Sequence, residues 1–503
     1  MGTHARERDV FYLRMDPMNT TWVPHELATA DLGDERLNAR FEMLLTALGN
    51  RPHLSIPAAC RGRAEIKAAY RFFAHPDVTF DAVLRPHIAA SIDRVRAQTV
   101  ALLVQDTTEI EQVRPAQVVV GAGPLDHARS GFLVHEMQAY TPEGTPLGTV
   151  WAEILNRTEE VPDAPQDKAK SKAYERKHTP LEDKESARWV AGLQAARAVA
   201  QDAPGVRCVC VADSESDVYE CVLEPRGDRP LDWIIRAAQN RALEARPGVL
   251  VWDHLLAQPV QYTAALTIRG RNAKIGIEDR SRRQDRTARA ATVEVRAATV
   301  TLRPPWRHDR VLDPVTVNVV LVREVNPPGG QPPVEWLLVT TLPIDTLDDV
   351  RTVVGYYCVR WQIEIFFRTL KSGCRIERRR FEHVDRVLPC VGLYLIVAWR
   401  TLFVCRMGRE HPDQDCEAVF EPSEWKAVWV AVHREAPPDT PPRLGVMVEL
   451  LATLGGDIPR KTTEPGPQAV WIGLQRMYDL AWAWDTFGPG SALHDPKPMP
   501  SPE

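Results

Sequence analysis

The spacing of hydrophobic and polar positions changes several times along the 503 residues of the chain. Residues 22–73 carry apolar side chains at helical intervals, which predicts helices. From Gln98 the segments TVALLVQD, VVVGAG and GFLVHEMQAY are runs of branched and aliphatic residues at strand-like lengths. A polar stretch at 157–185 is expected to form a surface loop, after which 186–200 predicts a helix and VRCVCVAD another buried strand. Strands and helices in this order indicate an α/β fold.

The second half of the chain opens with a β-like region and then turns helical. Between residues 241 and 345 apolar and polar positions alternate, and two strand-like runs flank a Pro-Pro-Gly-Gly turn, which predicts a β-hairpin. Thr346, followed by Leu347 and two aspartates, resembles a capping box. We expect one continuous helix from there to Lys371.

The C-terminal part of the chain is helix-rich and apolar. Its most apolar run, 387–399, is well short of the ~20 residues that a bilayer requires, so we expect a buried helix and no membrane partner. The linker EAPPDTPPR then precedes a last helical segment. One face of that helix is expected to carry four large side chains: Trp471, Leu474, Tyr478 and Trp482.

The composition describes a globular protein and argues at first against a nucleic-acid partner. Hydrophobic residues make up 44% of the chain and charged residues 26%, which excludes a disordered chain, and the formal net charge is −5. The charge is unevenly distributed, however, because residues 36–71, 269–289 and 351–380 carry net charges of +5, +5 and +6. These three basic segments are suited to phosphate contacts.

The cysteines and the N-terminus indicate an intracellular protein. The nine cysteines are scattered, odd in number and contain no C-x-x-C pair, so we expect reduced thiols and neither a zinc site nor a disulfide framework. The first residues carry charges where an export signal would be apolar. We therefore expect a cytoplasmic location.

Two acids each follow a run of apolar residues. Asp106 comes after LLVQ and Asp213 after VCVA, so both are expected at the ends of buried strands. Ligands and catalytic groups collect at such ends, because a rigid strand delivers a side chain to an open edge. One such acid alone is more often a turn or N-cap residue. Two of them indicate a site.

The expected helix YYCVRWQIEIFFRTLKSG carries the third acid. Tyr357, Arg360, Glu364 and Lys371 are spaced by 3, 4 and 7 residues, so they fall on one stripe of an α-helix. Taken alone, this stripe is more simply an exposed charged face with an Arg360–Glu364 pair. Together with the two aspartates, Glu364 completes three carboxylates that can hold a pair of Mg²⁺ ions for phosphodiester chemistry. Arg360 and Lys371 would then bind DNA phosphates.

This set of motifs resembles the cut-and-paste transposases of insertion-sequence family four, in particular the Tn-five type with its Y-R-E-K signature and DDE active site. The resemblance covers most of the chain. It rests on WVPHELATADLGDERLNARF, AAYRFFAHPDV, LLVQDTT, CVADSESDVYE, IIRAAQNR, VNPPGG before EWLLVTT, YCVRWQIEIFFRTLKSG, and LGG before a Trp-bearing helix. These segments stand in the order of the family.

The resemblance implies roles for eight residues. The metal-binding triad would be Asp106, Asp213 and Glu364, with two Mg²⁺ per active site and Mn²⁺ as a substitute. The residues that contact the transposon-end DNA would be Tyr357, Arg360, Lys371 and Arg236, and Trp336 would be the platform on which a flipped base stacks. From the sequence alone, Trp336 is more simply an aromatic residue of the hairpin core. Ser214 stands where the family has an arginine.

The resemblance also implies a domain plan. The expected fold is an RNase H-like α/β catalytic core with a β-rich insertion, a helical N-terminal DNA-binding domain and a helical C-terminal domain. The expected bounds are a loose extension at 1–20, end-binding helices at 21–75, the core at 76–240 and 346–400, the insertion at 241–345, dimerisation helices at 401–487 and a disordered tail at 488–503.

The expected function is that of a DNA transposase. The protein would bind terminal inverted repeats and target DNA as a homodimer in a synaptic complex, associated with the nucleoid. It would excise and insert a mobile element through a hairpin intermediate. Two alternatives remain open at this point: a catalytically inactive or domesticated regulator that binds DNA ends, and a structure-specific, Mg²⁺-dependent nuclease.

Overall fold

The computed structural model describes residues 22–60, 62–112, 119–157, 178–223, 231–268, 288–329, 331, 333–457 and 467–489. The expected N-terminal extension lies outside these residues, as do nearly all of the basic segment 269–289, the expected tail from 490 onward, and most of the polar stretch 157–185.

The N-terminal region is helical, as the sequence predicted. Its helices are α2 (Trp22–Glu26), α3 (Glu35–Asn50), α4 (Ile56–Ala59), α5 (Arg63–Phe73) and α6 (Phe80–Arg96). Asp34 caps α3, because its side chain accepts a hydrogen bond from the backbone N–H of Arg36 at 2.7 Å. The face of α3 that carries Phe41, Leu45 and Leu48 is fully buried.

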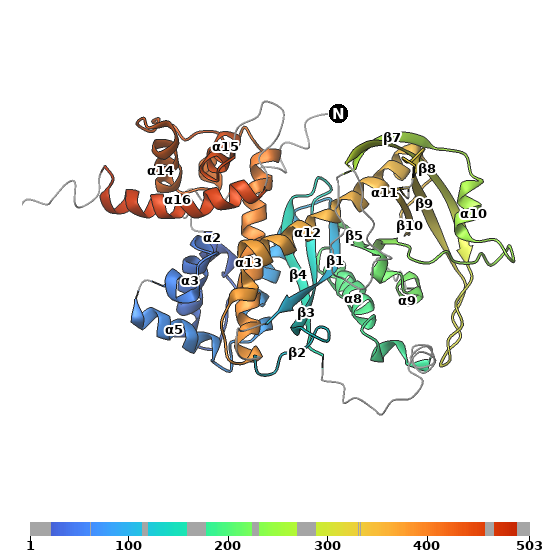
Figure 1. Cartoon of the computed structure of the whole chain (residues 1–503), viewed down its shortest axis with the longest axis horizontal. Helices are drawn as coiled ribbons and strands as arrows, with labels where there is room; N and C mark the ends of the chain where they lie inside the picture. Colours follow the sequence, from blue (N-terminus) through green and yellow to red (C-terminus); the bar gives the residue numbers. More distant parts are fainter. Residues whose placement is uncertain are drawn as a thin grey trace, which may run out of the picture.

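A single ten-stranded sheet runs through the molecule (Figure 1). Its core order is β4-β3-β1-β5-β6, with β3 antiparallel to its neighbours and β5 parallel to β1 and β6. The strands are β1 (Val100–Glu111), β2 (Gly123–Pro124), β3 (Ser130–Tyr140), β4 (Pro146–Leu155), β5 (Arg207–Ala212), β6 (Asp232–Arg236), β7 (Tyr262–Ile268), β8 (Arg289–Leu302), β9 (Val315–Val325) and β10 (Glu335–Thr340).

The β-rich insertion continues this sheet. Strands β9 and β10 form the predicted hairpin, and β10 pairs with β6 in an antiparallel register. The predicted strand VVVGAG is wrong in its described part, which forms only an isolated bridge between Val120 and His383 and the two-residue strand β2. Two glycines in this run and a turn at Gly121, with a φ of +85°, prevent a longer strand.

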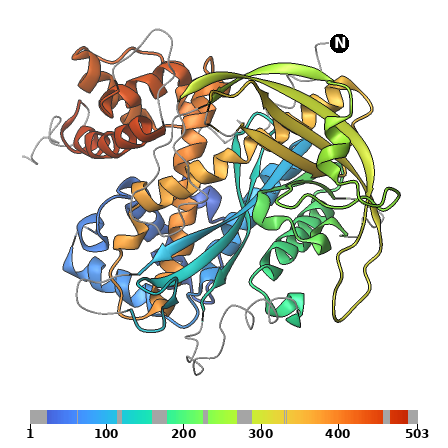
Figure 2. The same cartoon turned by 45° about the vertical axis from the view of Figure 1, so that its right-hand side comes forward.

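Helices cover both faces of the sheet (Figure 2). One face packs on α8 (Ala187–Asp202), α9 (Tyr219–Val222) and α10 (Val251–Leu256). The opposite face packs on α11 (Leu347–Val359), α12 (Trp361–Arg368) and α13 (Val384–Glu410), together with the N-terminal helices. Thr346 and Asp349 form the predicted capping box at the start of α11. The expected helix from Thr346 to Lys371 is wrong in its continuity, because it breaks at Arg360 and ends in a π-helical turn, Thr369–Gly373.

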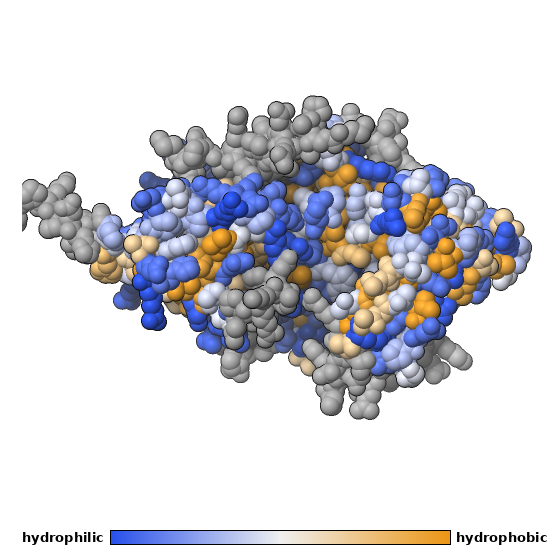
Figure 3. Space-filling view, turned by 90° about the horizontal axis from the view of Figure 1, so that it is seen from above, coloured by the Kyte–Doolittle hydropathy of each residue, from blue (hydrophilic) through white to orange (hydrophobic). Residues whose placement is uncertain are grey.

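The apolar run 387–399 lies within α13, which joins the core to the C-terminal helices (Figure 1). By length and composition alone α13 could cross a membrane, but 83% of its most apolar window is buried inside the protein. On the face seen from above, hydrophilic residues and separate hydrophobic patches are interspersed (Figure 3). The burial identifies α13 as the expected core helix.

The C-terminal helices form a third apolar cluster of their own. They are α14 (Pro422–His433), α15 (Leu444–Leu454) and α16 (Pro467–Phe487). On α16, Leu474 is buried, whereas Trp482 is 43% exposed. The predicted face of α16 is therefore only partly covered. All nine cysteines of the chain are free thiols, as expected.

Candidate active site

Asp106 lies inside a strand, which corrects the prediction that it ends one. Strand β1 continues to Glu111, because residues beyond Asp106 remain paired with β3, and Asp106 itself stands opposite Glu136. The parallel pairing of β1 with β5 stops earlier, at Val104 and Val211. Asp106 therefore lies just beyond the point at which β5 leaves the side of β1.

Asp213 does follow its strand directly, as predicted. It comes after the last residue of β5 and caps a short 3₁₀ turn, with its Oδ1 accepting a hydrogen bond from the backbone N–H of Glu215 at 2.8 Å. The alternative interpretation of Asp213, as an N-cap residue, is therefore also correct. The cap fixes one carboxylate oxygen of Asp213 and leaves the other available.

The alternation of the two strands directs both aspartates toward α12. Leu102 and Val104 of β1, and Val209 and Val211 of β5, belong to the apolar cluster of the α12 face. Because side chains two residues apart share a face, Asp106 and Asp213 lie on that face as well. Glu364 comes from the first turn of α12.

Arg360 joins the acids of the strand and the helix. Its side chain is only 6% exposed, its Nη2 donates to Glu364 Oε1 at 2.6 Å, and its Nη1 lies 3.4 Å from Asp106 Oδ2. The predicted pair between Arg360 and Glu364 is therefore present, but it is no exposed surface pair.

The acids create a concentration of negative charge. Burial and then the charge of Asp213 raise the pKa of Asp106 to about 7, a smaller rise comes from Glu364, and the Arg360 guanidinium opposes it. Buried carboxylates that repel one another are stabilised by a cation, and their hard oxygens suit Mg²⁺. Within the described residues, no three Asp, Glu, His or Cys side chains already surround an ion position. The donor set nevertheless fits a divalent metal, with Arg360 between Asp106 and Glu364.

A second group of predicted site residues lies next to the acids and consists of Trp336, Tyr357 and Arg236. The rings of Trp336 on β10 and Tyr357 on α11 have their centroids 5.6 Å apart. Tyr357 is buried, which raises its pKa, while the guanidinium groups of Arg360 and Arg236 oppose the rise. Trp336 is half-buried and packs on the core, so the interpretation as a hairpin core aromatic also holds.

Lys371 pairs with an acid that is not one of the three expected metal ligands. It lies in the π-helical turn after α12, and its Nζ is 3.8 Å from Glu377. Tyr357, Arg360 and Glu364 remain neighbours, and Lys371 follows them in a turn of π-helical geometry.

A polar network on the other face of β1 was not predicted from the sequence. Thr107 Oγ1 lies 2.8 Å from His135 Nδ1 and accepts from Arg188 Nε at 3.0 Å, and Arg188 Nη2 donates to Glu215 at 3.0 Å. One signal was available, because Gln105 and Thr107 are polar at positions that face the protein interior beside Asp106.

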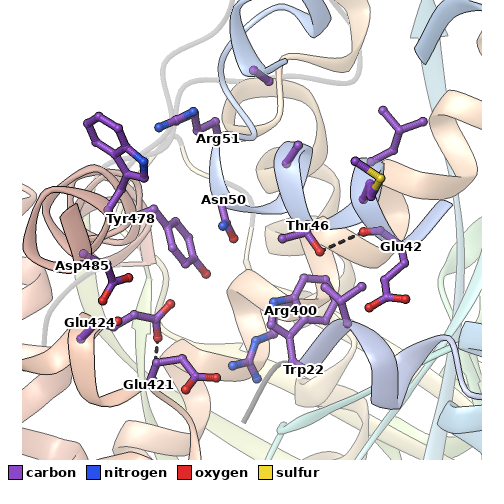
Figure 4. A pocket seen from close by; sticks show the side chains of 18 of the residues that line it. Trp22, Glu42, Thr46, Asn50, Arg51, Arg400, Glu421, Glu424, Tyr478 and Asp485 are labelled. Carbon is purple, nitrogen blue, oxygen red and sulfur yellow. Dashed lines mark hydrogen bonds between the residues drawn. The ribbon is translucent and has the colours of Figure 1, made fainter. Parts of the chain in front are cut away.

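A cavity of about 670 Å³ lies elsewhere, between α3 and the C-terminal helices (Figure 4). Its lining includes Trp22, Arg400, Glu424 and Tyr478, and none of the eight expected site residues. Burial raises the pKa of Glu424 to about 7. This hollow is therefore separate from the acids.

Three known families match the chain in sequence order. They are "Transposase DNA-binding" at residues 19–78, "Transposase DDE domain" at 179–396 and "Transposase Tn5 dimerisation domain" at 396–482. The DDE match contains Asp213 and Glu364 and begins after Asp106.

Together these matches confirm the expected α/β architecture with an RNase H-like core and helical ends. They support DNA binding, homodimer formation and dependence on a divalent metal, and a transposase acts on DNA inside the cell. The chain belongs to the DDE transposases of the Tn5 type, which cleave phosphodiester bonds of DNA and transfer DNA strands.

Proposed function

We propose that this transposase excises and inserts its mobile element by a cut-and-paste reaction with a hairpin intermediate. The observation that carries the proposal is the meeting of Asp106, Arg360 and Glu364 on the α12 face of the sheet, with Asp213 close enough to raise the pKa of Asp106. Strands β1 and β5 and helix α12 are rigid elements that hold these groups in place.

Asp106, Asp213 and Glu364 would hold the divalent metal, which we propose to be two Mg²⁺ ions replaceable by Mn²⁺. The metal supplies activation of the attacking hydroxyl and stabilisation of the leaving oxygen. Arg360 would balance the charge of Asp106 and Glu364 in the free protein. Its guanidinium would then bind a phosphate of the transposon end through charge-assisted hydrogen bonds.

The neighbouring aromatic group is suited to base flipping. A flipped base would stack on the half-buried indole of Trp336, which recovers part of the energy lost on unstacking. Tyr357 and Arg236 lie together beside it and would hold the phosphate of that base. Lys371 would contact a second phosphate from the turn after α12.

The remaining regions would divide DNA recognition and assembly. We propose that residues 21–75 read the terminal inverted repeats, that 76–240 and 346–400 form the catalytic core around the insertion at 241–345, and that 401–487 dimerise. Two protomers in a synaptic complex would each cut one transposon end before capturing target DNA, in association with the nucleoid. The same three acids, Asp106, Asp213 and Glu364, would serve every step of the reaction.

Two other functions account for fewer of these features. An inactive regulator would not need three acids that remain in place together. A structure-specific nuclease would need the acids but not the group formed by Arg236, Trp336 and Tyr357.

The test uses DNA that carries the inverted repeats flanking the gene, together with Mg²⁺. Wild type should nick the ends and form hairpins, whereas Asp106→Ala and Glu364→Ala should bind the ends without cutting them. Glu109→Ala is the matched control, because Glu109 is an acid of the same strand β1 that pairs with Arg129 at the surface. Equal cleavage by wild type and both active-site variants would refute the assignment of the acids.

A further inference from the structure

Strand β1 presents consecutive residues to opposite sides of the sheet. Asp106 faces α12, whereas Gln105 and Thr107 face α8 and the second apolar cluster, which includes Leu103. A side chain on α8 can therefore act on the position of Asp106 only through its neighbours in the strand.

Arg188, in the first turn of α8, contacts three segments at once. Its Nε donates to Thr107 Oγ1 at 3.0 Å, its Nη2 donates to Glu215 Oε2 at 3.0 Å, and its Nη1 donates to the carbonyl of Glu185 at 2.7 Å. The side chain is only 10% exposed. The guanidinium thus links β1 to the turn that follows β5.

Two of the three residues that Arg188 contacts, Thr107 and Glu215, each hold one of the two aspartates through a backbone N–H. The N–H of Thr107 donates to Asp106 Oδ1 at 2.7 Å, and the N–H of Glu215 donates to Asp213 Oδ1 at 2.8 Å. Arg188 is therefore one residue removed from each carboxylate, on the side of the sheet opposite to Arg360.

The helix approaches the strand closely enough for these contacts because of Gly192, one turn after Arg188. A Cβ atom on Gly192 would lie 2.1 Å from Gln105 Oε1 and 3.3 Å from His135 Nε2. Any larger residue would push α8 away from β1, or displace the Gln105 side chain.

A hydrogen-bond chain fixes the hydroxyl of Thr107. Burial and then the charge of Arg188 lower the pKa of His135 to about 3, so its ring is neutral. With its Nε2–H directed to Gln105 Oε1 at 3.1 Å, its Nδ1 accepts the Thr107 hydroxyl proton at 2.8 Å. The hydroxyl oxygen is then free to accept from Arg188.

We propose that Arg188 is a positioning residue that sets the separation of Asp106 and Asp213 and thereby the affinity of the site for its divalent metal. This inference rests on the proposed role of the two aspartates as metal ligands. Arg188 touches neither carboxylate, and it acts through Thr107 and Glu215. Residues that orient metal ligands typically contribute about 10- to 100-fold in metal affinity.

A lysine cannot replace Arg188 in this role. The three contacts use three different N–H directions of a planar fork, whereas an ammonium is a point charge on a flexible stem. Arg188→Lys therefore keeps the positive charge but cannot make all three hydrogen bonds. A loss of metal affinity in this variant would come from the lost positioning and not from a lost charge.

The experiment measures Mn²⁺ binding to the full-length protein without DNA, by electron paramagnetic resonance, alongside cleavage at increasing Mg²⁺ concentrations. Arg188→Lys and Glu215→Gln should each weaken Mn²⁺ binding, by about tenfold for Arg188→Lys. The double variant should be little worse than Arg188→Lys alone. Affinity for end DNA and the melting temperature should stay near wild type. Arg207→Lys is the control, because Arg207 also pairs with an acid, Asp232, at the opposite end of β5.

The outcomes separate this inference from the proposed function. Wild-type Mn²⁺ affinity in Arg188→Lys, or an equal loss in Arg207→Lys, would overturn the positioning role. Asp106→Asn tests the proposed function itself. If Asp106→Asn keeps wild-type Mn²⁺ affinity and wild-type cleavage, the assignment of Asp106 as a metal ligand fails. A tenfold loss in Arg188→Lys that high Mg²⁺ restores in the cleavage assay would support both.

Discussion

Arg360 donates to Glu364 at 2.6 Å across the junction of α11 and α12, and this pair places a buried cation among the acids of the site. We expect Arg360→Ala to lower the rate of strand cleavage by about 100-fold, because a buried cation directed at a phosphate stabilises the charge of the transition state. Arg360→Lys should be intermediate, since it keeps the charge without the bidentate fork. Single-turnover cleavage of end DNA measures both, and a wild-type rate in Arg360→Ala would contradict the role.

The metal requirement should depend on pH near neutrality. Burial and the charge of Asp213 raise the pKa of Asp106 to about 7, so the carboxyl is increasingly protonated below that pH. A metal must displace this proton, and its apparent affinity should fall about tenfold for each pH unit below 7. Titrations of cleavage against Mg²⁺ at pH 6, 7 and 8 test this, and saturating metal should move the activity midpoint to lower pH. A metal requirement independent of pH would refute the expectation.

Much of this site was predictable from local sequence patterns. The end of β5 at Asp213 and the helical position of Glu364 follow from an apolar run and from helical spacing. The position of Asp106 within β1 was not predictable, because the strand continues only through its pairing with β3. That partner is distant in the sequence.

The errors along the helix have a similar cause. The interruption at Arg360 was not predictable, since Tyr357, Arg360 and Glu364 have ordinary helical spacing and no glycine or proline stands between them. The contact of Arg188 with Thr107 spans 81 residues. Periodicity within one segment carries no information about such contacts.

Trp336 should matter for the hairpin step and not for the first nick. Stacking of a base on an aromatic side chain contributes about 1–3 kcal/mol, so Trp336→Ala should slow hairpin formation by one to two orders of magnitude. Trp336→Phe retains a platform and should lose less. Resolving nicked, hairpin and cleaved products on denaturing gels over time measures the steps, and normal hairpin formation in Trp336→Ala would exclude base stacking on this residue.

Arg379 should stabilise the junction between the N-terminal helices and the catalytic core. Its buried guanidinium donates to the backbone carbonyls of Pro52, Leu54 and Cys374 and lies 4.4 Å above the ring of Tyr394. Arg379→Gln should lower the free energy of unfolding by at least about 3 kcal/mol, because buried carbonyls lose their donors.

The matched control for Arg379 is its exposed neighbour. Arg378→Gln removes the same charge from the same 3₁₀ turn without unpairing a buried carbonyl. Differential scanning calorimetry gives the melting temperatures of Arg379→Gln and Arg378→Gln for comparison. Equal melting temperatures would show that the buried contacts contribute little.

Glu136, which stands opposite Asp106 on β3, should make the protein less stable as the pH rises. Its side chain is fully buried with hydrogen bonds to Thr149 and Gln138, and burial raises its pKa to about 8 from a usual value of 4.5. The unfolded chain ionises this carboxyl above pH 4.5, whereas the folded protein retains the proton. The stabilising contribution of the folded state is therefore complete below pH 4.5 and is lost as the pH rises through 8.

Glu136→Gln removes the ionisable group and keeps its shape, so its stability should not fall over this range. The advantage of Glu136→Gln over wild type should grow by about 1.4 kcal/mol for each pH unit between 5 and 8. Melting temperatures at pH 5 and pH 8 measure the difference, with Glu153→Gln, an exposed acid of β4, as the control. A difference between Glu136→Gln and wild type that stays constant with pH would mean that the buried carboxyl is already ionised in the folded protein.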